Sequence, residues 1–228
     1  MMPGATSSGY DIEMDDVIQN AMYYAAASTP NNNTAWVFDV DETSLSGYTE
    51  MLSIGFGYVA KINHDWVLSA VAPAITQTLN LYKQLITQGY KVIFLTGRKD
   101  TEHDATATNL VNVGYTQFET LITRTPAQYN LTAQAYKSGV RTMLVEQEGY
   151  DIVGCIGDQF SDINGPYTGF KVKLPNYIVR THTARTHRRI ARCCDQRAGS
   201  MVAEQARLML SRRFSWCLYP SVLNCACC

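Results

Sequence analysis

Apolar residues recur in two different rhythms over the first forty residues. Residues 10–27 carry apolar side chains at helical spacing, which predicts an amphipathic helix. Ala35 to Phe38 are all apolar and lead directly into Asp39 and Asp41, a pattern typical of a buried strand that ends at a functional site. Taken alone, the two acids also fit a loop with an Asx-turn or a helix N-cap.

The remaining pattern alternates helix and strand. Helices are predicted from Pro73 to Gly89, over 101–113 and over 132–148; strands are predicted over 91–95, 119–123, 151–156 and 169–174. We expect the strand over 91–95 to end abruptly at Thr96, and the strand over 169–174 to be short and to lie at an edge. This alternation indicates a doubly wound, Rossmann-like α/β fold, in which helices cover both faces of a mostly parallel sheet.

Residues 46–70 interrupt this alternation with glycines and aromatic residues that follow no clean period. A long loop inside an α/β domain is more often functional than not. We interpret it as a small insert after the first strand, beside the strand ends. Packing and substrate contact are both open as roles for its aromatic side chains.

Composition limits the class of protein. With 228 residues and 46% apolar content, the chain is long enough for one hydrophobic core. No run approaches the roughly 20 apolar residues that a membrane span needs, so we expect no membrane association. Met1 to Tyr10 lack a basic region followed by an apolar stretch, so we expect no signal peptide in this sequence. Cys155 lies in an apolar run and is predicted to be a buried thiol.

The charge divides the chain in two. Residues 1–180 carry 11 Lys and Arg against 18 Asp and Glu, whereas residues 181–228 carry eight Arg and two acids. Six of the seven cysteines also lie beyond residue 180. A zinc module with Cys225, Cys227 and His182 or His187 fits no usual ligand spacing, and a basic nucleic-acid-binding tail is a weak alternative. We therefore predict a domain over 1–180, followed by a Cys-rich tail outside the fold.

Polar clusters follow three predicted strands: Asp39 with Asp41, Thr96 with Gly97, and Asp158 with Asp162. The carboxyl ends of parallel strands share one edge of a sheet, so these clusters can converge, and Lys137 lies on the helix before the last of them. Carboxylates can hold Mg²⁺, a hydroxyl and a glycine N–H can hold phosphate oxygens, and a lysine can neutralise them. This inventory suits phosphoryl transfer.

At this point the sequence resembles a known family. Four segments resemble the motifs of the haloacid dehalogenase superfamily: Phe38 to Thr43, Leu95 to Arg98, Tyr136 to Ser138, and Gly157 to Asp162. The segments Trp36 to Asp39, Ala72 to Ala74, Asn109 to Tyr115 and Lys173 to Asn176 are similar to its plant acid phosphatase and vegetative storage protein branch. The resemblance covers roughly residues 10–180. It departs from the usual pattern at Ser44, where leucine is common.

The resemblance implies a mechanism by residue. Asp39 would be the nucleophile that forms an aspartyl-phosphate, and Asp41 the acid and base. Asp39, the Asp41 backbone carbonyl and Asp158 would hold Mg²⁺, with Asp162 as a further ligand. Thr96, Gly97, Lys137 and Thr43 would bind the phosphoryl group. For Asp162, a helix cap or a bond to Lys137 is equally open, and Arg98 could simply tie down its own loop.

Three functions are consistent with this resemblance: an acid phosphatase for small phosphomonoesters, a storage protein of the same fold, or an inactive truncated member. The presence of Asp39 favours the enzyme. The short insert predicts an open site that selects no particular ester. We expect no nucleic-acid partner and leave a homodimer and the compartment open, because members of the branch are secreted or vacuolar. Two sequons, at Asn32 and Asn130, fit secretion but arise easily by chance.

Removal of the tail tests the predicted boundary near residue 180. Truncation after a residue between Asn176 and Arg180 should leave the melting temperature and phosphatase activity unchanged, because the predicted strands and all four motifs precede it. Solubility under non-reducing conditions should improve, because exposed thiols oxidise and cross-link. Thermal unfolding and phosphate release check this, and a truncated chain that unfolds or loses activity would place the tail inside the fold.

Overall fold

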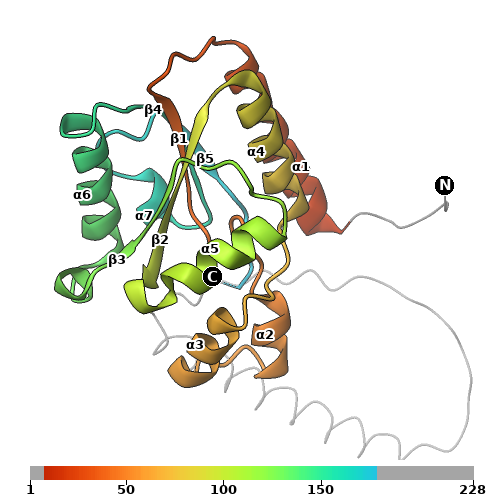
Figure 1. Cartoon of the computed structure of the whole chain (residues 1–228). Coiled ribbons are helices and arrows are strands. Elements are labelled where there is room, and N and C mark those ends of the chain that lie inside the picture. Colours follow the sequence, from red (N-terminus) through yellow and green to blue (C-terminus); the bar gives the residue numbers. More distant parts are fainter. Residues whose placement is uncertain (1–7, 179–228) are drawn as a thin grey trace, which may run out of the picture. The chain divides into compact units, whose positions relative to one another are not determined.

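A five-stranded parallel sheet lies at the centre of the structure, a computed structural model that describes residues 8–178 (Figure 1). Its strands are β1 (Thr34–Phe38), β2 (Lys91–Lys99), β3 (Thr120–Arg124), β4 (Asp151–Gly157) and β5 (Phe170–Lys173). Their order across the sheet is β3-β2-β1-β4-β5, and every neighbouring pair is parallel. This confirms the predicted α/β fold with a parallel sheet, and β5 is short and at an edge, as expected.

The helices of this part of the chain are α1 (Gly9–Ala26), α2 (Tyr48–Ser53), α3 (Ala60–Leu68), α4 (Thr76–Gln88), α5 (His103–Asn112), α6 (Ala133–Glu146) and α7 (Phe160–Ile163). Short 3₁₀ turns cover Asp100–Glu102 and Pro126–Gln128. Local sequence explains several boundaries. The Ser8 hydroxyl accepts the Asp11 N–H and begins α1, and Gly89 ends α4 in the left-handed conformation, with φ of +89°.

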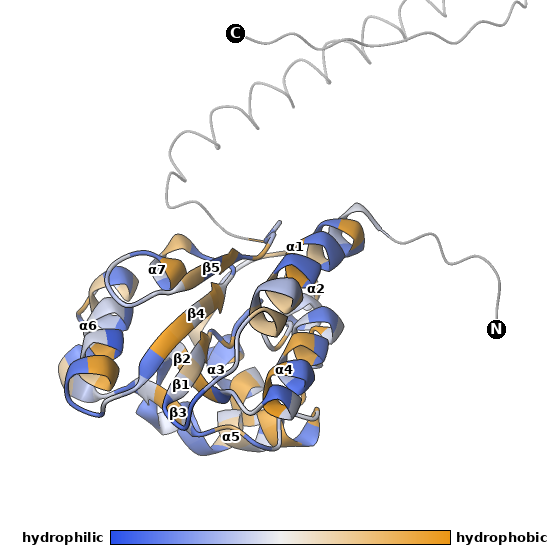
Figure 2. Cartoon of the chain, turned by 90° about the horizontal axis from the view of Figure 1, so that it is seen from above, coloured by the Kyte–Doolittle hydropathy of each residue, from blue (hydrophilic) through white to orange (hydrophobic). Residues whose placement is uncertain are grey.

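Alternate residues of β1 enter two separate cores. Trp36 and Phe38 point to the face covered by α1, α4 and α5, whereas Ala35 and Val37 point to the face covered by α6 and α7. In Figure 2 the apolar strands lie between α6 on one side and α1 with α4 on the other. Burial on both faces explains why β1 is apolar at every position rather than alternating.

The structure corrects two predictions. β2 does not end at Thr96: after an irregularity between Leu95 and Lys99, pairing with β3 resumes at Lys99 and Arg124. The Thr96–Gly97–Arg98 motif therefore lies in a bulge inside the strand, which re-aims its side chains. The insert is also more ordered than a loop, since α2 and α3 form within it and α3 packs beside α5 (Figure 1).

Two further predictions concern single features. Cys155 is a buried free thiol, as predicted. Within residues 8–178 no helix has both the length and the apolar character to cross a membrane. The tail predicted from residue 181, with its alternative zinc ligands, lies outside the described residues. Tyr177 and Ile178 belong to the described part, so the tail truncation is best made after Arg180.

Candidate active site

The carboxyl ends of β1 and β4 bring the predicted acids together. Phe38, the last residue of β1, pairs with Ile156 of β4 and with Phe94 of β2. The Asp39 N–H then donates to the Ile156 carbonyl at 3.0 Å, so Asp39 and Asp158 emerge side by side. The predicted convergence of the three strand ends is therefore observed.

Three of the acids form a buried cluster. Asp39, Asp158 and Asp162 are 6%, 2% and 4% exposed, and one carboxylate oxygen from each lies within 4.8 Å of the others. Burial raises the pKa of Asp39, and the neighbouring carboxylates add to this effect, while Lys137 opposes it. Buried carboxylates this close need a compensating positive charge.

Lys137 supplies part of that charge. Its Nζ lies 2.6 Å from Asp39 Oδ1 and 2.5 Å from Asp162 Oδ1. Burial disfavours the ammonium, but the two carboxylates outweigh it and raise the pKa of Lys137 above its ordinary value. Because three carboxylates face one ammonium, the cluster keeps an excess of negative charge.

Asp162 makes both of the contacts that the sequence left open as alternatives to a metal-binding role. Its Oδ1 binds Lys137, and its Oδ2 accepts the Gln159 N–H at 2.9 Å at the start of α7. The side chain of Asp162 packs directly against the backbone of Gly157. Any larger residue at 157 would clash with it, because a Cβ there would lie 2.2 Å from the Asp162 side chain. Asp162 therefore caps its helix while staying inside the carboxylate cluster.

The hydroxyls of Thr43 and Ser44 contact Asp39 and Asp158. Thr43 Oγ1 lies 3.3 Å from Asp39 Oδ2 and 3.4 Å from Asp158 Oδ1, and it accepts the Asp158 N–H at 3.0 Å. Ser44, the residue that departs from the family pattern, donates to the backbone carbonyl of Asp39 at 2.7 Å. Both residues are fully buried. They hold the loop after β1 in place around the predicted nucleophile.

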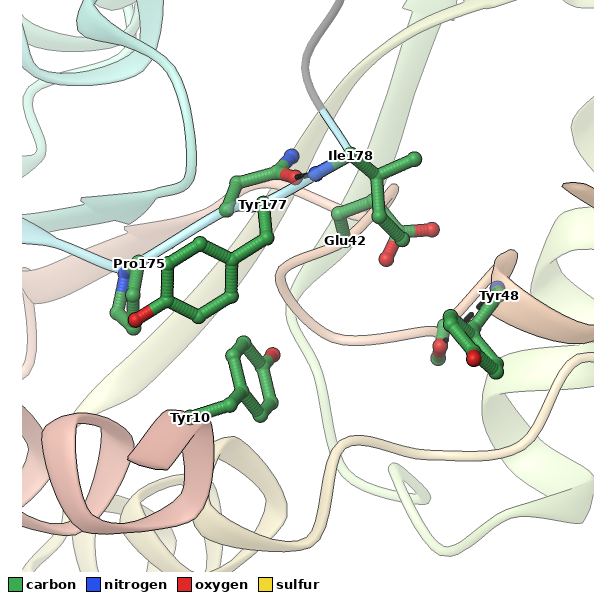
Figure 3. Close-up of a pocket in the computed structure, with 8 residues that line it drawn as sticks. Tyr10, Glu42, Tyr48, Pro175, Tyr177 and Ile178 are labelled. Atoms are coloured by element: carbon green, nitrogen blue, oxygen red, sulfur yellow. Dashed lines mark hydrogen bonds between the residues drawn. The ribbon is translucent and has the colours of Figure 1, made fainter. Parts of the chain in front are cut away.

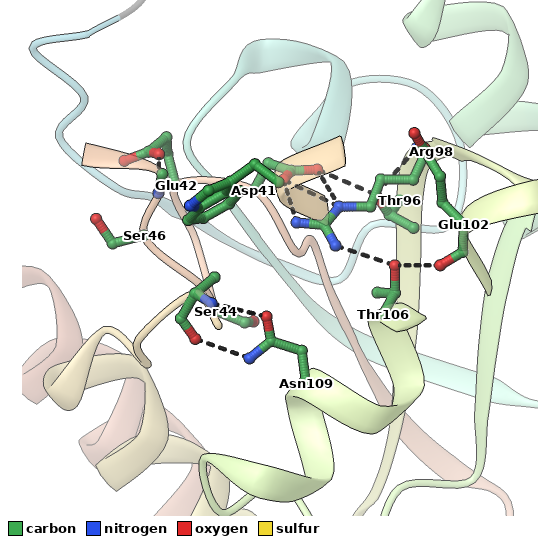
Figure 4. Close-up of polar contacts among 12 residues, drawn as sticks. Asp41, Glu42, Ser44, Ser46, Thr96, Arg98, Glu102, Thr106 and Asn109 are labelled. Atoms are coloured by element: carbon green, nitrogen blue, oxygen red, sulfur yellow. Dashed lines mark hydrogen bonds and ion pairs between the residues drawn. The ribbon is translucent and has the colours of Figure 1, made fainter. Parts of the chain in front are cut away.

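Asp41 is not a member of this cluster. Its carboxylate forms an ion pair with Arg98 (Figure 4). The guanidinium contacts the Asp41 carboxylate through Nε at 3.1 Å and Nη2 at 2.7 Å, and Thr106 holds its Nη1 at 3.0 Å. The Asp41 side chain is 53% exposed. Desolvation works against ionisation, but the charge and hydrogen bonds of Arg98 outweigh it and lower the pKa of Asp41.

Thr96 and Gly97 differ in accessibility. Thr96 is buried, and its hydroxyl accepts the Arg98 N–H at 3.1 Å and lies 3.4 Å from Asp41 Oδ2. Gly97 is exposed, and a Cβ at this position would have nothing within 4 Å. Arg98 thus does more than tie down its own loop, because it joins the bulge of β2 to the acid after β1.

A pocket of about 360 Å³ adjoins the site (Figure 3). Tyr10 and Tyr177 form one side of it, and Glu42 and Tyr48 lie on the other. Glu42 directly follows Asp41 in the chain, and Asn176 of the pocket wall donates to Asp158 Oδ2 at 2.5 Å. The insert therefore contributes Tyr48 to the pocket, while Trp66 packs against the core.

Glu42 gives the site a measurable pH dependence. Its φ is +54°, and its carboxylate accepts the Gly47 N–H at 2.6 Å. Burial, with a smaller contribution from Asp41 and Asp158, raises the pKa of Glu42 from 4.5 to about 7. A raised pKa means that the folded chain holds this proton more tightly than the unfolded chain, so stability is lost as the pH rises from about 4.5 to about 7.

Glu42→Gln should therefore stabilise the protein only at high pH. In the presence of a chelator, the variant should melt at the wild-type temperature at pH 4 and above it at pH 8, by the equivalent of about 1–2 kcal/mol. Thermal unfolding at the two pH values measures this. An equal difference at both pH values would show that ionisation of Glu42 is not the cause.

Two functional contacts escaped the sequence analysis. Asn176 belongs to a segment that matches the family pattern, yet no local pattern places it beside Asp158. The pairing of Arg98 with Asp41 joins residues 57 positions apart. Both depend on strand order, which brings the ends of β5 and β2 to the same edge as β1 and β4.

A parallel α/β sheet with an acidic cluster at the carboxyl edge of β1 and β4, bridged by a lysine, defines a fold of the haloacid dehalogenase class. The chain belongs to the acid phosphatase subfamily IIIB of this superfamily, whose family profile matches residues 3–182. The family recognised from the sequence motifs is thereby confirmed.

Its relatives include both enzymes and storage proteins. "Acid phosphatase 1" of Solanum lycopersicum is 37% identical over 179 residues, which cover 75% of this chain and 70% of that protein. The "Stem 31 kDa glycoprotein" of Glycine max is 36% identical, covering 72% and 66%, and "Vegetative storage protein 1" of Arabidopsis thaliana is 35% identical, covering 75% and 65%. The chain thus spans about two thirds of the length of these relatives.

A solved structure shows the same fold. The class C acid phosphatase from Bacillus anthracis, determined with tungstate bound, superposes with a TM-score of 0.61 and is 24% identical. The superposition covers 76% of this chain and 81% of that one.

Proposed function

We propose that this chain is an acid phosphatase that hydrolyses phosphomonoesters through an aspartyl-phosphate on Asp39, with Mg²⁺ as cofactor. The observation that carries the proposal is the buried cluster of Asp39, Asp158 and Asp162, with Lys137 bonded to two of its members. Membership of the acid phosphatase subfamily supports the same activity.

Asp39 is the proposed nucleophile. One of its oxygens attacks phosphorus, the bond from phosphorus to the ester oxygen breaks, and the alcohol leaves. The attack brings two anions together, and like charges 4 Å apart repel by about 4 kcal/mol at an effective dielectric near 20. Lys137, whose Nζ lies 2.6 Å from Asp39 Oδ1, offsets part of this repulsion.

Asp41 is the proposed acid and base. It gives a proton to the leaving ester oxygen and later takes one from the water that breaks the bond between phosphorus and Asp39. It is the most exposed of the four acids, whereas the other three are buried. Because Arg98 lowers the pKa of Asp41, the base form is favoured, and an acidic medium favours the protonated form that the first step needs.

The cluster fits a hard divalent cation. All of its donors are carboxylate oxygens, they lie within 4.8 Å of one another, and Lys137 leaves part of their charge unbalanced. Asp39, Asp158 and Asp162, with the Asp41 backbone carbonyl, would hold Mg²⁺. When bound, the cation supplies positive charge that stabilises the phosphoryl group during transfer.

The pocket beside Glu42 and Tyr177 gives room for the organic part of the ester. Its aromatic side chains offer apolar surface without a cation that would select one acidic group. This agrees with an open site that accepts many small phosphomonoesters.

The second candidate function is a non-catalytic storage protein, because relatives at 34–37% identity include proteins named for storage. Release of phosphate from a generic phosphomonoester, with and without Mg²⁺, distinguishes the two. Turnover that requires the cation supports the enzyme. No release under either condition would favour the storage protein.

Gly97→Ala tests the predicted phosphate contact. The chain itself leaves space for the added methyl group, since nothing lies within 4 Å of a Cβ at this position. If the phosphoryl group binds against Gly97, the methyl group takes its place, so we expect a rise in KM of about tenfold or more and an unchanged melting temperature. Steady-state kinetics and thermal unfolding measure both, and an unchanged KM would remove Gly97 from the phosphate site.

A further inference from the structure

The segment that follows β5 reaches back to the carboxylate cluster. Residues 174–178, which we call the C-terminal strap, begin with Leu174, whose N–H donates to the Gly157 carbonyl at 2.9 Å and whose side chain is fully buried. Asn176 Nδ2 then donates to Asp158 Oδ2 at 2.5 Å. At the end of the strap, the Tyr177 hydroxyl donates to Glu13 Oε2 of α1 at 2.6 Å.

The orientation of the Asn176 amide follows from its second partner. The Ile178 N–H donates to Asn176 Oδ1 at 2.6 Å. A backbone N–H can only donate, so the oxygen of the amide must face Ile178 and the NH₂ group must face Asp158. The strap therefore directs a hydrogen-bond donor, not an acceptor, at the carboxylate.

Asp158 is held differently from the other two acids of the cluster. Asp39 and Asp162 are bonded to the Lys137 ammonium, whereas neutral donors contact both oxygens of Asp158. Thr43 Oγ1 lies 3.4 Å from Oδ1, and Asn176 Nδ2 contacts Oδ2. A neutral amide fixes the direction of a carboxylate without adding a positive charge that would compete with a metal ion.

We propose that Asn176 is a positioning residue that holds Asp158 in the orientation in which the cluster binds Mg²⁺. The proposal rests on the metal site of the proposed function. Loss of a group that orients a metal ligand typically weakens metal binding about 10- to 100-fold. Asn176 acts through Asp158, so its loss lowers the affinity for Mg²⁺, and saturating Mg²⁺ restores turnover.

The test compares Asn176→Leu with Tyr177→Phe in the full chain. Asn176→Leu removes the bonds to Asp158 and to the Ile178 N–H with a side chain of similar size, and Tyr177→Phe removes the neighbouring bond of the strap to Glu13. Titration calorimetry with MgCl₂, without substrate, should give a 10- to 100-fold weaker dissociation constant for Asn176→Leu and the wild-type value for Tyr177→Phe. In kinetics, Asn176→Leu should regain kcat at high Mg²⁺.

Each result decides the matter. Wild-type Mg²⁺ affinity in folded Asn176→Leu overturns the positioning role, as does an equal loss in Tyr177→Phe, which would mark the strap as merely structural. If Asn176→Leu does not fold, Asn176→Ser gives the same comparison with a shorter polar side chain. If the wild type binds Mg²⁺ but hydrolyses no ester, a loss of affinity in the Asn176 variant still supports the positioning role while the proposed function fails. If it hydrolyses esters without binding Mg²⁺, the positioning role and the Mg²⁺ cofactor both fail, while the phosphatase activity stands.

Discussion

Asp39→Asn should leave less than about one thousandth of the wild-type phosphatase activity, because a neutral amide cannot attack phosphorus and the remaining groups act only together with the nucleophile. Asparagine has nearly the same shape: its oxygen can accept from Lys137, and its NH₂ group can donate to the Thr43 hydroxyl, the two groups that contact the oxygens of Asp39. The variant should therefore fold. Phosphate release from a generic monoester at saturating Mg²⁺, followed over hours, measures the residual rate.

Asp104→Asn is the matched control for this substitution. Asp104 is on α5 with a fully exposed side chain, so the same chemical change there should leave activity intact. Mass spectrometry of acid-quenched wild type should find phosphate on Asp39 during turnover, and none on the variant. If Asp39→Asn kept a tenth or more of the activity, the covalent role of Asp39 would be wrong.

Removal of divalent metal should abolish activity, and Mg²⁺ should restore it. The physical reason is the unbalanced charge of the cluster: an anionic ester cannot approach three buried carboxylates compensated by a single ammonium. A chelator followed by titration with MgCl₂ measures the loss and the recovery. Full activity in chelator would mean that the acids serve another purpose.

Asp158→Asn extends this test to one ligand. The variant should need a much higher Mg²⁺ concentration or lose turnover altogether, because the metal loses a charged oxygen donor. Asp151→Asn is its control, since Asp151 is exposed at the opposite end of the same strand. A normal Mg²⁺ requirement in Asp158→Asn would exclude Asp158 from the metal site.

The sequence predicted the elements of the fold because the two cores of this domain leave clear patterns. The apolar run of β1 and the helical stripe of α1 are local signals that survive in isolation. Glycines such as Gly89 mark helix ends for a backbone reason, since few other residues adopt a positive φ. The acids of the site and Thr96 stand out in the sequence because they follow the apolar runs of buried strands, where polar residues are uncommon without a functional reason.

What the sequence could not show depends on contacts between distant segments. The bulge that carries Thr96 is visible only once β3 pairs with β2 again at Lys99. The helices of the insert are short, α2 with six residues and α3 with nine, and a Gly-rich stretch separates them, so their segment looked like a loop. Asn176 has no local signal at all, because its role arises from the place of β5 next to β4.

The position of β1 in the sheet has a consequence for the order in which the domain forms. Its two partners, β2 and β4, come later in the chain, and β4 ends only at Gly157. During synthesis, more than a hundred further residues follow β1 before both of its edges can pair. Strand pairings between segments so far apart in the chain form slowly. A nascent chain that ends before β4 would present an unpaired apolar edge, a template for aggregation. The strand that leads to the proposed nucleophile is therefore also a segment that needs protection while the chain is incomplete.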